Sequence, residues 1–269
     1  MRLVLLLGIV TVALAQTQPA VSNARLRTEA FSGNLRVQIA GPGPAWFGYA
    51  VKSPVRNSQS CCSNNGYECG CSLEGNSTHS GVTSSSGPVK LEGSDAIAVL
   101  YRIDNNAVEK IRVFSISCPL DAGGLPFTWI TNVPANASLA FLKTLLPKDQ
   151  AIFAVSQHDG PEALQMLIDI AKADPAPHAR SQALFWLAGR AGEKAAATIT
   201  DAIENDPDTG VKKHAVFALS QLPKDQAVPK LIEIAKTQRN PEVRKQAFFW
   251  LGQSRDPRAL AYIEQVLLR

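Results

Sequence analysis

The chain has 269 residues, of which 45% are hydrophobic and 19% charged, and its formal net charge is +4. No residue type is extreme, which excludes collagen-like, coiled-coil and disordered classes and leaves a globular protein of one or two domains. The small net charge, without any block of like charges, gives no sign of a nucleic-acid partner.

The N-terminus has the features of a secretory signal peptide in the correct order. Met1-Arg2 is a basic start, residues 3–12 are almost entirely apolar, and Ala13-Leu14-Ala15 is a small-residue cleavage pattern. A buried helix is the alternative interpretation, since the run is shorter than the roughly 20 residues that span a bilayer. No cysteine follows the cleavage pattern, so no lipid anchor is predicted there. We expect residues 1–15 to be removed, leaving a periplasmic or secreted protein without a transmembrane segment.

Residues 16–132 are predicted to form a mainly-β domain that contains the cysteines. Leu35, Val37 and Ile39 alternate with their neighbours as in a half-buried strand, and residues 46–51 form a second candidate strand. Residues 95–103 and 107–116 are two further β-rich runs. The residues between them, Asp104-Asn105-Asn106, tolerate positive φ and therefore predict a hairpin loop.

All the cysteines precede the helical half, and an oxidising compartment would favour disulfides between them. Five cysteines allow at most two intrachain bridges. We favour bridges from the Cys61/Cys62 pair to Cys69 or Cys71, or out to Cys118, with the connectivity left open. A zinc site is an alternative, although the spacing differs from the usual C-x2–4-C, and a redox centre would lack C-x-x-C. No metal site and no cofactor is predicted. The disulfide candidates are Cys61, Cys62, Cys69, Cys71 and Cys118.

Residues 133–269 carry an internal repeat. The string Gln-Ala-Ile-Phe-Ala-Val that begins at Gln150 has counterparts that begin at Gln182, His214 and Gln246, always 32 residues apart. A fixed period of this size indicates a helical solenoid. Two further columns share the period: Ala163, Ala195, Ala227 and Ala259, and Leu167, Ile199, Leu231 and Ile263.

Each unit contains two apolar-periodic segments separated by proline or glycine, which predicts a helical hairpin. Residues 137–146 precede the first complete unit and predict a helix that caps the stack and joins it to the β domain. In the third unit Pro229 is expected in the first turn of its helix, where a missing N–H costs little. Trp186 and Trp250 alternate with two alanines in one column, which indicates packing of large against small residues, with cofactor stacking as the alternative.

The segment Asn240-Pro241-Glu242-Val243-Arg244, followed by an Ala-Phe-x-x-Leu helix, resembles HEAT repeats, in the short form also called bilin-lyase-like repeats. The resemblance covers the C-terminal half. Together with the strands it implies an α+β multidomain protein, in which a mainly-β domain precedes an α-solenoid of about four HEAT-like helical hairpins.

The resemblance also implies that the second helices line a concave surface. The partner-binding groove predicted on that basis contains Met166, Asp169, Asp201, Lys230, Glu233 and Tyr262. A basic column, Arg180, Lys212 and Arg244, shares the 32-residue period. Ion pairs between repeats, or a solvated face, are the alternative interpretation of both charged columns.

No motif for nucleophilic, phosphate-binding, zinc-protease or dinucleotide chemistry occurs, and the four histidines are scattered. We therefore predict no catalytic residues. The main hypothesis is an exported, non-enzymatic interaction or scaffold protein that binds a protein partner through the solenoid. The alternatives are an enzyme or a chromophore-attachment factor, and a zinc- or redox-active cysteine domain docked by the solenoid.

Overall fold

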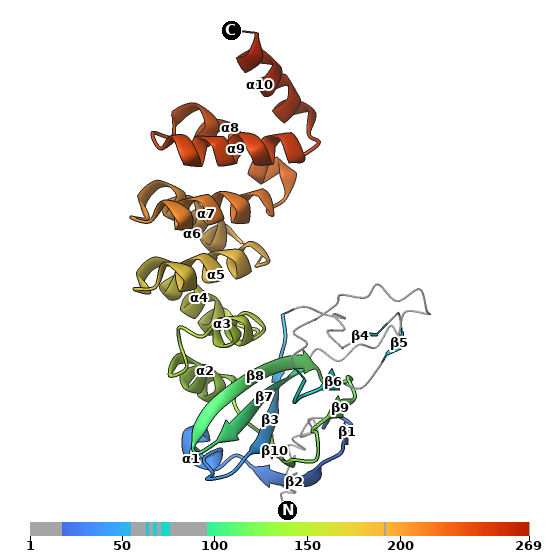
Figure 1. Cartoon of the computed structure of the whole chain (residues 1–269). Coiled ribbons are helices and arrows are strands. Elements are labelled where there is room, and N and C mark those ends of the chain that lie inside the picture. Colours follow the sequence, from blue (N-terminus) through green and yellow to red (C-terminus); the bar gives the residue numbers. More distant parts are fainter. Residues whose placement is uncertain are drawn as a thin grey trace, which may run out of the picture.

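The structure is a computed structural model that describes residues 18–54, 63–64, 67–68, 71–75, 96–190 and 192–268. The predicted signal peptide and Cys61, Cys62 and Cys69 lie outside the described residues. Strands occupy the N-terminal part and packed helices the C-terminal part, so the architecture is α+β (Figure 1).

The largest sheet has five strands in the order β2-β10-β3-β7-β8. β10 is parallel to both of its neighbours, β2 and β3, whereas β7 is antiparallel to both of its neighbours, β3 and β8. Asn105 and Asn106 have φ of 48° and 61°, which confirms the predicted hairpin between β7 and β8. The strand bounds are β2 Arg25–Ala30, β3 Ala45–Lys52, β7 Ala96–Asp104, β8 Ala107–Ser115 and β10 Pro126–Thr131.

Short strands complete the N-terminal part. Val21–Ser22 (β1), Leu120–Asp121 (β9) and Cys71–Ser72 (β6) form a parallel three-stranded sheet in the order β1-β9-β6. β4 (Ser63–Asn64) pairs with β5 (Tyr67–Glu68).

Apart from the exposed edge strand β2, the large sheet contributes side chains to an apolar cluster on each face, since successive side chains along a strand point to opposite sides. Trp46, Leu100 and Trp129 lie in one apolar cluster with residues of the small sheet, among them Leu120. Tyr49 and Tyr101 lie in the other cluster, which continues into the helices. The N-terminal sheet and the helical stack therefore share one continuous core.

The predicted strand at residues 35–39 is wrong, because Leu35–Gln38 forms a short helix, α1. Asn34 caps it by accepting a hydrogen bond from the backbone N–H of Val37. Leu35 and Ile39 are buried, whereas Val37 is 71% exposed, which is the pattern of a helical turn rather than of a strand. β2 and β10 were not predicted from the sequence.

The helices of the C-terminal half pair into four successive hairpins, as predicted: α3 with α4, α5 with α6, α7 with α8, and α9 with α10. α2 precedes them and packs against α3, as expected for the joining helix. No helix in the described part of the chain is long and apolar enough to cross a membrane. The bounds are α2 Ala135–Lys143, α3 Asp149–Ser156, α4 Pro161–Ala173, α5 Pro177–Ala188, α6 Glu193–Asn205, α7 Thr209–Ser220, α8 Lys224–Thr237, α9 Pro241–Gln253 and α10 Pro257–Leu267.

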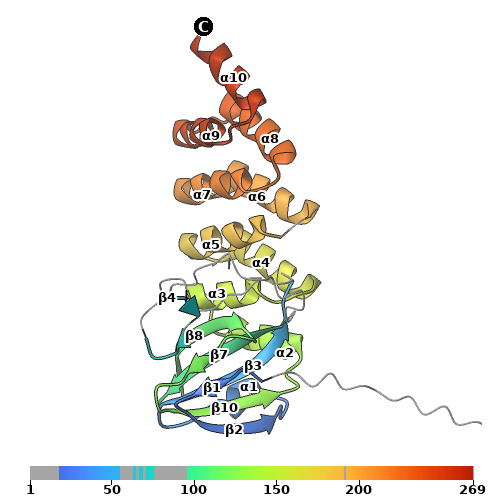
Figure 2. The same cartoon turned by 90° about the vertical axis from the view of Figure 1, so that its right-hand side faces the viewer.

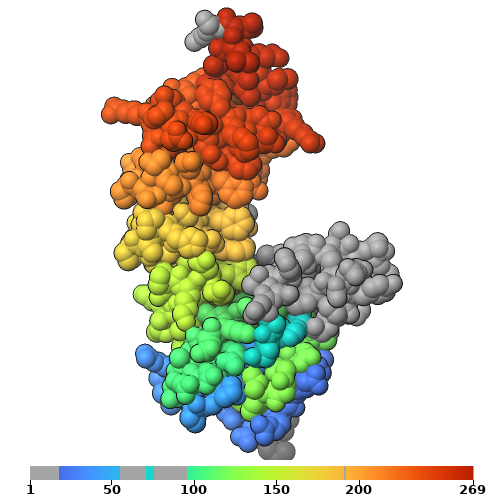
Figure 3. Space-filling model, viewed as in Figure 1, coloured from blue at the N-terminus to red at the C-terminus, as the bar shows by residue number. Residues whose placement is uncertain are grey.

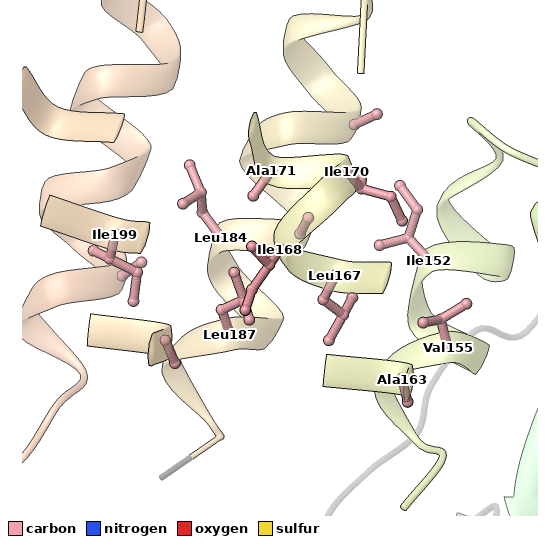
Figure 4. Close-up of a cluster of buried hydrophobic side chains, with 14 of the residues drawn as sticks. Ile152, Val155, Ala163, Leu167, Ile168, Ile170, Ala171, Leu184, Leu187 and Ile199 are labelled. Atoms are coloured by element: carbon pink, nitrogen blue, oxygen red, sulfur yellow. The ribbon is translucent and has the colours of Figure 1, made fainter. Parts of the chain in front are cut away.

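The repeated columns form the core of the stack. The alanines at 151, 183, 215 and 247 are fully buried, and small side chains at these positions let successive helices approach closely. Leu167 and Ile199 from the second helices meet Leu184 and Leu187 of α5 in the same apolar cluster (Figure 4). The starts of α7 and α9 follow the capping rule, since Asp208 and Asn240 accept hydrogen bonds from the backbone of their own helices.

The first and second helices of the hairpins form two layers. α5, α7 and α9 lie on one side of the stack, and α4, α6 and α8 lie on the other (Figure 2). Pro229 lies within α8 rather than in its first turn, because α8 begins at Lys224. The backbone carbonyl of Asp225 therefore lacks its usual donor four residues later.

Candidate functional site

The acidic residues predicted for the groove lie at equivalent places on the second helices. Asp169 and Asp201 are exposed, and each carboxylate accepts a hydrogen bond from an amide side chain one turn away, at 2.8 Å from Gln165 and 2.7 Å from Asn205. Glu233 is also exposed and forms no ion pair with a described residue. These carboxylates form a solvated column whose local partners are neutral.

The other predicted groove residues are less accessible. Met166 is half-buried and packs on the core, and Lys230 is half-buried. Tyr262 is a correction to the predicted set: it is only 8% exposed, and its ring stacks on that of Phe248 at 5.7 Å. The ring of Tyr262 therefore packs the last hairpin and does not line an open surface.

The basic column closes the C-terminal ends of the second helices. Arg180 Nη1 donates to the carbonyl of Asp174, Arg244 Nη1 to that of Gln238, and Lys212 Nζ to that of Glu204. Carbonyls at a helix C-terminus lack hydrogen-bond donors within the helix, and the side chains of the basic column donate to them. The column is thus explained by packing within the stack.

Arg180 additionally joins two repeats. Its Nε and Nη2 donate to the two carboxylate oxygens of Asp206 at 2.7 and 2.9 Å, and both side chains are almost fully buried. Burial alone would raise the pKa of Asp206, but hydrogen bonds from Arg180 and from the backbone of Asp208 lower it overall. The hydrogen bonds with Asp206 in turn raise the pKa of Arg180.

Aromatic side chains form a continuous series across the first helices, which we call the aromatic ladder. Its neighbouring rings have centroids 4.8 to 5.9 Å apart. Phe185 and Phe217, from adjacent repeats, are nearly parallel, with an interplanar angle of 13°. The series runs in the order Phe153, Trp186, Phe185, Phe217, Trp250 and Phe249.

Two members of the ladder are notably open to solvent. Phe185 is 40% exposed and Phe249 is 53% exposed. Because they belong to one continuous series of rings, these exposed aromatic side chains are candidates for a binding surface. The signal was present in the sequence as the Phe153, Phe185, Phe217 and Phe249 column, but periodicity alone did not show which face of the first helix points outward.

Successive helices pack more closely in one layer of the stack than in the other. α5 packs on α3 and α7, and α7 packs on α9, more extensively than α6 packs on α4 or α8. The first helices therefore pack more closely on one another than the second helices do. The resemblance had implied that the second helices line a concave surface.

The tryptophans of the ladder are packed between repeats. Trp186 contacts Phe153 of the preceding repeat, and Trp250 contacts Phe217 in the same way. Both rings are half-buried, and each Nε1 is covered without a hydrogen-bond partner. The alternating alanines Ala154 and Ala218 are fully buried, which leaves room for the large rings.

A chain of buried hydroxyls connects the sheet to the stack. Tyr49 Oη is 2.7 Å from Tyr101 Oη and 2.6 Å from Ser138 Oγ, and Ser138 Oγ is 2.7 Å from His158 Nε2. His158 Nδ1 is 2.7 Å from the carbonyl of Ala154, which can only accept. Nδ1 of the neutral ring must therefore donate, so Ser138 donates to Nε2, Tyr49 to Ser138, and Tyr101 to Tyr49.

This chain resembles a nucleophile–base arrangement, but its position suits a structural role. Ser138 and His158 are fully buried, so no substrate reaches them in this conformation. Burial lowers the pKa of His158 to about 4 and raises that of Tyr49 to about 12. Both groups are thus neutral at pH 7. Arg190 fixes the turn further by donating to the carbonyls of Ser156 and His158.

Two of the cysteines lie in the apolar cluster that the large sheet shares with the small sheet. Cys71 and Cys118 are fully buried, and each is disulfide-bonded. A sulfur in a disulfide offers no thiolate to a metal. Nearby, Glu74 accepts hydrogen bonds from Trp46 and Arg102 at 2.8 and 2.9 Å. In the described part of the chain, no group of three or more His, Cys, Asp or Glu side chains is placed to hold a metal ion.

Comparison with known proteins supports the helical assignment. A family model for HEAT repeats matches residues 164–246 and, again, residues 196–269. No curated protein matches the chain. The two matched spans cover the stack from within α4 to the last residue.

Proposed function

Because the C-terminal half of this chain is a HEAT-repeat region, we propose that the protein is a non-enzymatic scaffold that binds a protein partner through its solenoid. HEAT repeats form elongated surfaces that suit protein interaction. The observation that carries the proposal for this chain is the aromatic ladder, with Phe185 and Phe249 open to solvent. The side of the stack that bears the first helices faces the viewer in Figure 3.

The energetics favour a binding role for these two rings over a stabilising one. Burying a large apolar side chain stabilises a fold by about 1.5–3 kcal/mol, and an exposed ring forgoes part of that gain. Aromatic side chains are also the residues that most often dominate binding energy at interfaces. A partner that covered Phe185 and Phe249 would recover the missing burial.

We further propose that the protein acts outside the cytoplasm. The order of basic, apolar and small residues in 1–15 supports export, and the two disulfide-bonded cysteines suit an oxidising compartment. N-terminal sequencing of the protein from its native host should begin at Gln16. A chain that retains Met1 in the cytoplasmic fraction would contradict this proposal.

Photo-crosslinking in the native host tests the scaffold proposal. A benzophenone amino acid is placed at Phe185 or Phe249 on the first helices, at Asp201 on the second helices, or at Thr28 on the sheet edge as a control. We expect one partner protein to be trapped from the solenoid positions on at least one of the two layers and not from Thr28. Trapping from Thr28 alone, or from no position, would contradict a solenoid scaffold.

A further inference from the structure

Polar side chains flank the phenylalanines of the ladder on the exposed face of the first helices. One column precedes the phenylalanines by three residues and the other follows them by four, so all three columns share one helical face. Three of the four members of each flanking column are glutamines. The preceding column is Gln150, Gln182, His214 and Gln246, and the following column is Gln157, Gly189, Gln221 and Gln253.

Most of these amides have hydrogen-bonding capacity to spare. Gln150, Gln182 and Gln246 form no side-chain hydrogen bond with any described residue. Gln157 and Gln221 each donate only to the hydroxyl of the preceding serine. An amide side chain offers one acceptor and two donors, the complement of a peptide backbone. The face thus presents apolar rings between two rows of groups that match main-chain N–H and C=O.

The charge of this face changes along the stack. Asp149, one turn before Phe153, is hydrogen-bonded to His178, whereas lysines occupy the equivalent positions in the last two repeats. Lys213 and Lys245 lie one turn before Phe217 and Phe249 and form no ion pair with a described residue. Glu242 lies in the first turn of α9, on the same side, and forms no ion pair with a described residue. The phenylalanine and amide columns themselves contain no carboxylate. A ligand that carries acidic side chains would therefore complement the two lysines.

The spacing of the repeats fits an extended chain. Packed helices lie about 8–10 Å apart, and an extended chain rises about 3.3 Å per residue, so one repeat corresponds to about three ligand residues. A helical ligand would already satisfy its own backbone groups and leave the amide columns unused. The free amides favour the extended form.

We propose that the exposed face of the first helices binds an extended segment of a partner protein. The glutamine side chains would form hydrogen bonds with the backbone of that segment, and the phenylalanines would contact apolar side chains at every third ligand residue. Lys213 and Lys245 would pair with acidic residues of the ligand. This proposal rests on the proposed scaffold function and adds to it the class of ligand. The face would accommodate about ten to twelve residues over four repeats.

Selection from a library of random twelve-residue peptides, with the mature full-length protein as bait, tests the proposal. We expect enriched peptides to carry apolar residues at three-residue spacing together with Asp or Glu. Binding of a selected peptide should weaken at least tenfold in Phe185→Ala/Phe249→Ala, in Gln182→Ala/Gln246→Ala and in Lys213→Glu/Lys245→Glu. The matched control Asp169→Ala/Asp201→Ala, on the second helices, should bind as the parent does.

Methylation of the peptide's backbone nitrogens separates recognition of the backbone from that of side chains alone. It should abolish binding if the amide columns hold an extended chain. Binding that survives methylation, enrichment of basic or helical peptides, or no enrichment over Phe185→Ala/Phe249→Ala would overturn the proposal. If those results came with photo-crosslinking from Asp201 alone, the scaffold function would stand and only this assignment of the face would fail.

Discussion

Ser138 Oγ donates to His158 Nε2 across 2.7 Å, and this hydrogen bond joins α2 to the turn after α3 beneath the sheet. The direction of the bond requires a neutral imidazole, because a protonated ring would present N–H at both nitrogens. The Ser138 proton would then lose its acceptor. The joint between the sheet and the stack is therefore sensitive to the charge of one side chain.

The first prediction concerns pH. The pKa of His158 is about 4 in the folded protein, against 6.5 for the unperturbed side chain. As pH falls below about 6.5 the unfolded state binds the proton first, so stability is lost between pH 6.5 and 4. Protonation of this histidine in the unfolded state should therefore lower the free energy of unfolding by about 2 kcal/mol between pH 7 and pH 5. Urea unfolding at both pH values should show that loss in the parent and a smaller one in His158→Gln; equal losses would contradict the argument.

The second prediction concerns the direction of the buried hydroxyl chain. Ser138→Ala leaves the Tyr49 hydroxyl without an acceptor and His158 Nε2 without a donor, which should cost about 1–3 kcal/mol. Tyr101→Phe removes only the first donor and strands no other buried proton, so it should cost less. Denaturant unfolding at pH 7 compares the two variants. A larger loss in Tyr101→Phe would mean that the chain runs the other way.

The third prediction concerns the bond between repeats. Arg180→Met leaves the Asp206 carboxylate buried without its cation and should destabilise the stack by about 3 kcal/mol. A second change, Asp206→Asn, removes the stranded charge and should restore part of the loss. Thermal unfolding of the single and double variants measures this. If the double variant were the less stable of the two, the buried charge would not be the cause of the loss.

The fourth prediction concerns Gly48 in β3. A Cβ there would lie 2.5 Å from Leu100 Cδ2 and 3.1 Å from the Trp129 ring, so Gly48→Ala should cost about 1–3 kcal/mol through overpacking. Gly252 lies in α9 with no such neighbour within 4 Å, and Gly252→Ala should stabilise by up to about 1 kcal/mol. Opposite signs in a urea melt are expected. A neutral Gly48→Ala would show that Leu100 can move away.

The sequence alone determined the helical stack, because each repeat must bury the same face against its neighbours. Ala151, Ala183, Ala215 and Ala247 recur at fixed spacing for that reason, and all are fully buried. It also determined the β7–β8 hairpin, since Asn105 and Asn106 adopt the positive φ that asparagine tolerates. In both cases the pattern is local or strictly periodic, so it predicts the structure without any knowledge of the tertiary contacts.

Tertiary structure decided the rest. Residues 35–38 became a helix because burial of Leu35 and Ile39 on one side outweighs an alternation too short to specify a strand. Periodicity placed Phe185 and Phe249 in one column but did not show whether their side chains point toward the second helices or toward solvent. Tyr49, Ser138 and His158 are distant in sequence, and only the packing of α2 and α3 under the sheet brings them into one hydrogen-bonded chain.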